Sequence, residues 1–181
     1  MERVGFGKRL GAFLLDCVIV WVLAYLLGGT IGGLVGNRLG SLAPPNMTGA
    51  DPGTAALTAG MIGTMMGVVA AAAVLGTVYF LVEGFTGFTL GKLLLGIRVG
   101  SADGTQAPVS QLLKRYALKN ISFLSTLLAA VTGVALINTV GSLLGLAIFI
   151  GCFFVLGANR QALHDMLAKT AVYPKDKLAP A

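Results

Sequence analysis

Long uncharged apolar stretches alternate with short polar segments along the chain. Three stretches contain no charged residue: 17–37, 52–82 and 120–159. An uncharged apolar run of about 18 residues or more is typical of a membrane-spanning helix. We therefore predict an all-α fold, a polytopic transmembrane helix bundle with spans at 8–36, 58–82, 119–137 and 139–158.

The last apolar stretch leaves the number of spans open. Residues 121–156 are too many for one comfortable span of about 20 residues and enough for two short ones. Gly133, Asn138 and Gly141 offer a break near its middle. If the polar segments on both sides lie in the same compartment, the chain crosses an even number of times. That favours four membrane helices or a re-entrant hairpin; the alternative is one long tilted helix, three membrane helices in total.

The polar segments predict short interfacial elements within one domain that covers residues 1–181. Segment 84–118 contains two amphipathic pieces, which we expect to be brief helices at the membrane surface. Residues 37–57, rich in Pro, Gly and Asn, predict an exterior loop, and residues 159–181 predict a cytoplasmic tail.

Composition and charge agree with a multi-pass membrane protein. Of the 181 residues, 56% are hydrophobic and 11% are charged, against about 25% charged in a soluble domain. The net charge is +6, but of the Lys and Arg residues only Arg38 lies between the first two predicted spans. This distribution follows the positive-inside rule. We expect the cell (inner or plasma) membrane, both termini in the cytoplasm, and no nucleic-acid partner.

Glycines recur at every fourth position on the first two predicted helices. They are Gly28, Gly32 and Gly36 on the first, and Gly63 and Gly67 on the second. Small residues at this spacing line one helix face and allow a neighbouring backbone to approach closely. We expect tight packing of the two helices; the alternative is that the glycines only loosen the helix end beside the loop.

Asp16 lies inside the first apolar helix, where a carboxylate is costly. A charged residue at the centre of a membrane helix costs about 2.5–3.5 kcal/mol on insertion scales. Arg9 lies seven residues earlier on the same stripe, about 10 Å away along the axis. Asp16 should therefore face the bundle and have a partner, for which the candidates are Arg9, Arg98, Lys92, Arg115 and His164.

Three motifs occur in order and together resemble the RDD family of small bacterial membrane proteins, named for one arginine and two aspartates. They are KRLGAFLLD, TLGKLLLGIRV with DG and LLKRYALKN after it, and NRQALHDMLAKTAVY. The resemblance identifies Arg9 as the family arginine and Asp16 and Asp165 as the two aspartates. It implies a transport role, and alkali-cation/proton exchange in some members.

The charged residues of these motifs should gather at the cytoplasmic ends of the helices. If the last helix continues past Leu156, Arg160 and His164 lie four apart on one face, with Asp165 on a neighbouring stripe. We expect an ion or proton site of Arg9, Asp16, His164 and Asp165, supported by Arg98, Lys92, Arg115 and Arg160. The other interpretations are ion pairs that only clamp the helix ends, and capture of lipid headgroups or anionic substrates.

Two functions from different classes fit these residues. The first is a small-ion or solute transporter, with a monovalent cation or proton as ligand and a homo-oligomer as the working form. The second is an accessory or scaffold subunit of a larger membrane complex; membrane lipids are partners in both cases. We expect no enzyme, cofactor or metal site, because no catalytic triad order and no metal-ligand spacing occurs.

Overall fold

A computed structural model describes residues 2–42 and 51–179, and 76% of the chain is helical. The prediction of an all-α fold is confirmed. Three helical segments are long and apolar enough to cross a membrane: Phe6–Arg38, Gly53–Thr86 and Ala135–Leu156. The chain divides into two compact units, which we call the hairpin unit (residues 16–79) and the mixed unit (residues 1–15 and 80–181).

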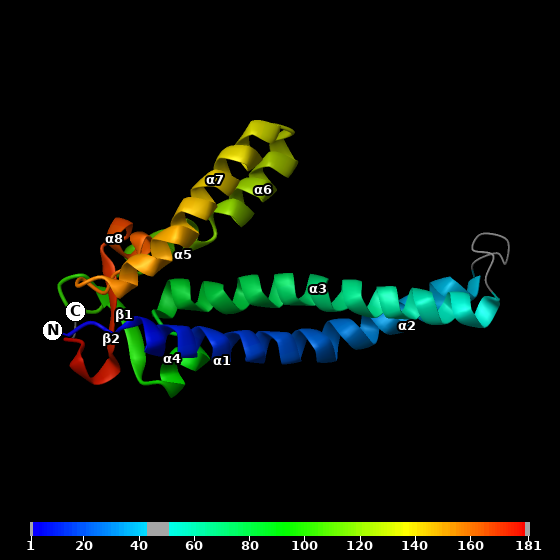
Figure 1. The fold of residues 1–181 in the computed structure, drawn as a ribbon, viewed down its shortest axis with the longest axis horizontal. Helices are drawn as coiled ribbons and strands as arrows, with labels where there is room; N and C mark the ends of the chain where they lie inside the picture. The colour runs from blue at the N-terminus through cyan, green and yellow to red at the C-terminus, as the bar shows by residue number, and fades with distance from the viewer. Residues whose placement is uncertain (1, 43–50, 180–181) are drawn as a thin grey trace. The chain divides into compact units, whose positions relative to one another are not determined.

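The hairpin unit consists of two long helical arms that run side by side (Figure 1). The first arm is formed by α1 (Phe6–Ala24) from residue 16 onward, a π-helical turn (Tyr25–Gly29) and α2 (Thr30–Leu42). The second arm is α3 (Pro52–Thr86) up to residue 79. The expected loop at 37–57 is therefore shorter than predicted, because α2 and α3 extend into it. Residues 43–50 of that loop lie outside the described residues.

Glycine backbones bring these two arms into direct contact. A Cβ atom built on Gly28 would collide with the carbonyl oxygen of Gly67, and one on Gly32 with that of Gly63. At Gly36 the collision would be with the carbonyl oxygen of Ala59. Since lipid tails are as apolar as the helices, close van der Waals packing is what holds such helices together.

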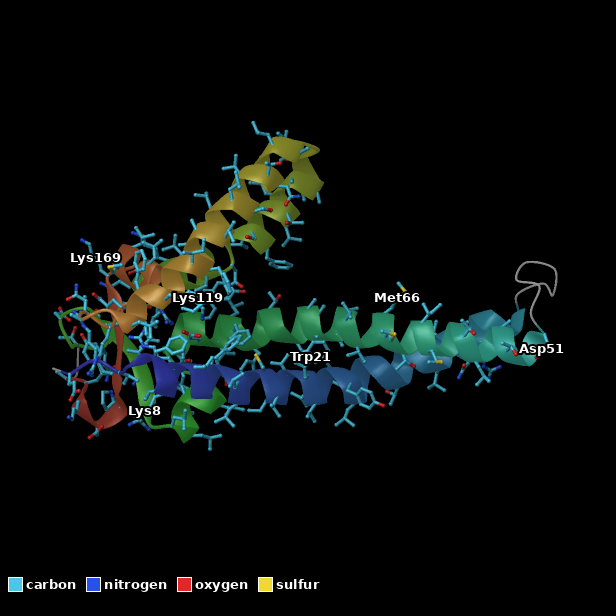
Figure 2. The ribbon with its side chains drawn as sticks, in the orientation of Figure 1. Lys8, Trp21, Asp51, Met66, Lys119 and Lys169 are labelled. Carbon is cyan, nitrogen blue, oxygen red and sulfur yellow. The ribbon has the colours of Figure 1, made fainter. Side chains whose placement is uncertain are left out.

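Large apolar side chains are exposed along the surface of the hairpin unit. On α3, Leu57, Met61, Met65 and Met66 are each about 70% exposed, and Met66 is labelled in Figure 2. Exposed large apolar side chains along an entire helix suit contact with lipid rather than with water.

The mixed unit combines short helices with a small sheet. Its elements after α3 are α4 (Leu90–Leu94), β1 (Ile97–Ser101), α5 (Val109–Lys119), α6 (Ile121–Thr132), α7 (Ala135–Gly151), a 3-10 turn (Cys152–Leu156), α8 (Leu163–Leu167), β2 (Thr170–Pro174) and a second 3-10 turn (Lys175–Lys177). A small core joins α1 and the segment before it to β1, α5 and β2; it consists of Val4, Ala12, Ile97, Val99, Leu112 and Val172.

The sheet was not predicted from the sequence. β1 and β2 pair antiparallel, from Ile97 opposite Pro174 to Ser101 opposite Thr170. The backbone N–H of Val4 donates to the carbonyl of Val172 at 2.8 Å, so the segment before α1 is attached to the same sheet. Residues 159–179 of the segment predicted as a tail (159–181) are thus part of the fold, because strand β2 completes the mixed unit.

The stretch 121–156 forms a helical hairpin, and the single long helix is excluded. The chain turns at Gly133, which has φ +71°, rather than at Asn138. α6 has 12 residues, about 18 Å of helix, against about 30 Å of hydrocarbon. The expected fourth full span is therefore a shorter helix. The Thr126 hydroxyl donates to Asn138 Oδ1 at 2.8 Å and joins α6 to α7.

Candidate functional site

Six charged side chains from five helices form one connected set in the mixed unit, which we call the charge cluster. It consists of Arg9 on α1, Glu83 in the last turn of α3, Lys92 on α4, Arg115 and Lys119 on α5, and Asp165 on α8. Arg9, Lys92, Arg115 and Asp165 are residues that the sequence assigned to the site, and the structure brings them together.

Asp165 is fully buried and lies at the centre of one half of the cluster. Arg9 Nη1 donates to Oδ2 at 2.6 Å and Arg115 Nε to Oδ1 at 2.7 Å. Burial alone acts to raise the pKa of Asp165, but the guanidinium groups of Arg115 and Arg9 hold that pKa well below the usual range. Asp165 is therefore a fixed negative charge.

Arg115 connects Asp165 to Glu83, the centre of the other half. Its Nη1 pairs with Glu83 Oε1, which also accepts Lys92 Nζ at 2.5 Å, while Glu83 Oε2 accepts Lys119 Nζ at 3.2 Å. Burial opposes the charge of Arg115, but the carboxylates of Asp165 and Glu83 outweigh it and raise the pKa of Arg115. Burial lowers the pKa of Lys92 to about 7, although Glu83 acts in the opposite direction.

His164 lies beside the cluster as a neutral ring. Burial, with the charge of Arg115, lowers the pKa of His164 to about 3. Its Nε2 lies 3.3 Å from Asp165 Oδ1, and an ionised carboxylate only accepts, so the ring proton is assigned to Nε2. Nδ1 then has a lone pair and faces Cys152 Sγ at 3.9 Å.

Two residues expected to support the site bind elsewhere. Arg98 Nη2 donates to the carbonyl of Thr86 at 3.0 Å, and its guanidinium lies over the Phe88 ring. The Arg160 side chain pairs with Glu2 at 2.8 Å, and only its carbonyl oxygen accepts from Arg9, at 2.7 Å. The predicted continuation of the last helix past Leu156 is wrong, because Arg160 has φ +46° and helix α8 starts only at Leu163.

Asp16 belongs to the hairpin unit, not to the unit that contains the charge cluster. Its side chain is buried, with 1% of the residue exposed. The Tyr79 hydroxyl of α3 donates to Asp16 Oδ1 at 2.6 Å. A carboxyl group with an aromatic hydroxyl as donor therefore lies within the segment that is apolar enough to span the membrane.

Sequence reasoning missed Tyr79, Lys119 and the role of Glu83. Tyr79 and Glu83 are four residues apart on α3, so they share one helix face. This spacing of a hydroxyl and a carboxylate at the end of an apolar helix could have indicated from the sequence that α3 contributes polar residues to the site. Among residues 2–42 and 51–179, no group of three His, Cys, Asp or Glu residues is placed to hold a metal ion.

These features define an integral membrane protein, with apolar helices long enough to cross a bilayer and a buried charge cluster in its mixed unit. The RDD family model matches residues 3–169, nearly the whole chain, and the protein belongs to the RDD family. Comparison with curated proteins and with solved structures gave no match.

Proposed function

We propose that the protein transports a small ion or solute, with exchange of a monovalent cation against a proton as the specific reaction. The observation that carries this proposal is Asp16, which is buried, accepts a hydrogen bond from Tyr79 and lies in an apolar membrane-length segment. A carboxyl group in that setting costs free energy, and such residues commonly mark ion or proton pathways.

In this proposal Asp16 carries one proton in its neutral form and binds one cation in its ionised form. The Tyr79 hydroxyl donates a hydrogen bond to Asp16 Oδ1 and holds the carboxyl group in place. His164 is neutral at pH 7 because the pKa of His164 is lowered to about 3. The proposal therefore assigns the transported proton to Asp16, and to Arg9 and Asp165 the task of fixing the start of α1 to α8.

Localisation in the cell membrane, with both termini in the cytoplasm, is part of the same proposal. It is supported by the position of the basic residues, of which only Arg38 lies between the first two spans. A homo-oligomer as the working form is also proposed, since a few helices of one chain enclose little room for an ion path.

The test is ion flux in liposomes that contain the purified protein and a trapped pH indicator. An outward potassium or sodium gradient should drive proton movement with the wild type, and Asp16→Asn should abolish it. Tyr79→Phe removes the hydrogen-bond donor to Asp16 Oδ1, so it should lower flux. Tyr25→Phe is the matched control, because Tyr25 is 64% exposed, and should leave flux unchanged.

Two outcomes would contradict the proposal. Flux that survives Asp16→Asn, in a variant with wild-type helicity and gel-filtration profile, would remove Asp16 from the mechanism. Absence of wild-type flux, together with a stoichiometric partner in gentle purifications, would favour the alternative of an accessory or scaffold subunit.

A further inference from the structure

Glu83 contacts three cationic side chains, which carry more positive charge than one carboxylate neutralises. Lys92 Nζ and Arg115 Nη1 both contact its Oε1, and Lys119 Nζ contacts its Oε2. The second carboxylate of the cluster, Asp165, is already shared by Arg9 and Arg115. The charge cluster therefore has four cationic groups for two carboxylates, and most of these side chains are buried.

A buried surplus of positive charge is relieved when one cation loses its proton. Arginine does not deprotonate in proteins. The Lys119 side chain is 31% exposed, so water can solvate its ammonium group. Lys92 is an amine and is only 8% exposed, which leaves it as the group of this cluster that can release a proton.

We propose that Lys92 is a proton-binding site and that its occupancy decides how firmly α4 is held to the last turn of α3. The proposal goes beyond transport and does not depend on Asp16. When Lys92 is protonated, a charge-assisted hydrogen bond joins α4 to Glu83. When it is neutral, Glu83 keeps Arg115 and Lys119, so the carboxylate remains paired and α4 loses its ionic attachment.

The neighbouring charged groups leave Lys92 with one carboxylate in the mixed unit. From α3 it faces Glu83, and from α5 the cations Arg115 and Lys119 oppose its charge. On β1, which packs on α4, Arg98 is directed to the Thr86 carbonyl, and on α1 Arg9 is bound to Asp165. Burial, the largest influence, lowers the pKa of Lys92 to about 7, which agrees with this arrangement.

α4 is built to respond to such a change. It is a five-residue helix in which Lys92 is the only charged residue, and Leu90 and Leu94 are 52% and 72% exposed. The ion pair between Lys92 and Glu83 is thus the one ionic attachment of α4, while Leu90 and Leu94 lie on the surface. Loss of the proton should loosen α4 while the rest of the charge cluster stays in place.

The direct test is a titration of lysine side chains by NMR on the full chain in detergent micelles, with ¹³C at Cε. One lysine signal, that of Lys92, should titrate near pH 7. Lys92→Arg should remove that signal, and the matched control Lys114→Arg, at an exposed position on α5, should leave it. Titration of every lysine signal at its ordinary pH would overturn the proposal.

Hydrogen exchange of the α4 amides tests the mechanical consequence. Corrected for intrinsic rates and compared with α5, wild-type α4 should exchange about tenfold faster at pH 8 than at pH 6. Lys92→Met should exchange fast at both pH values, and Lys92→Arg slowly at both. Equal α4 protection at pH 6 and pH 8 in the wild type would refute the proposal without any variant. Asp16→Asn should retain the Lys92 titration, so the result of this test does not depend on whether the transport proposal is correct.

Discussion

Replacement of Arg115 by methionine should destabilise the mixed unit more than any other single change in the charge cluster. Arg115 is buried and is the one side chain of this cluster that contacts both carboxylates, Asp165 and Glu83. Methionine keeps much of the apolar length of the side chain and removes the guanidinium. The two carboxylates then remain buried with fewer partners.

The expected cost follows from the partners that remain. Loss of one member of a buried ion pair costs about 3–5 kcal/mol. Asp165 retains Arg9 and His164, and Glu83 retains Lys92 and Lys119, so we expect the lower end, about 3 kcal/mol. This is a factor of about 150 in the unfolding equilibrium. Arg115→Lys should lose about half as much, because one ammonium group lacks the planar fork that reaches both carboxylates.

The measurement is unfolding by SDS in mixed micelles with two probes. Protection of the β1–β2 amides follows the mixed unit, and the fluorescence of Trp21, the one tryptophan, follows the hairpin unit. Arg115→Met should lower the midpoint of the first probe and leave the second close to wild type. Lys114→Met is the control, since Lys114 is exposed on the same helix, and should change the free energy of unfolding by less than about 0.5 kcal/mol.

Either of two results would refute this reasoning. A free energy of unfolding for Arg115→Met within about 0.5 kcal/mol of wild type would mean that the buried ion pairs contribute little. An equal loss for Lys114→Met would mean that α5 is sensitive to any loss of positive charge, wherever its side chain points.

Two further predictions concern packing and pH. Gly67→Ala should lower the stability of the hairpin unit in SDS titrations, because the new Cβ collides with the carbonyl of Gly28. Gly76→Ala is the control: its Cβ would lie 3.8 Å from Val20 Cγ1, an ordinary contact, so this change should leave the stability unchanged or raise it. An equal effect of both would remove the role of close backbone contact. Because the pKa of His164 is lowered to about 3, the unfolded state binds its proton first, so stability should fall as pH drops from about 6.5 toward 3. His164→Gln should flatten that decline in an acid titration followed by circular dichroism, and an unchanged slope would contradict the assignment.

Hydropathy and charge were sufficient to predict the class of fold, because they act over whole segments. The apolar stretches that contain Asp16 and Tyr79 are long enough that no soluble alternative fits. Family motifs also placed Arg9 and Asp165 in one site, and the structure pairs them at 2.6 Å.

What the sequence did not predict depends on contacts between distant segments. β1 and β2 have five residues each, so neither shows enough alternation of apolar and polar residues to indicate a strand. They also lie far apart in the chain, so no short turn between them indicates that they pair. Glu83 resembles an ordinary helix-end charge until α4 and α5 bring Lys92 and Arg115 to it. The last helical segment ends at Leu156, because Gly157 is extended with ψ 172°, and the left-handed φ of Arg160 that follows has no signal in its residue type.

The pairing of β2 with β1 orders the steps of biosynthesis. β2 and α8 follow the three membrane-length helical segments of the described residues, yet the carbonyl of Val172 accepts from the Val4 backbone and Asp165 pairs with Arg9. During translation, the earlier helices are therefore made before Asp165, the carboxylate that pairs with Arg9 Nη1 and Arg115 Nε. The nascent protein therefore passes through a stage at which its long helices are complete but the mixed unit still lacks α8 and its second strand.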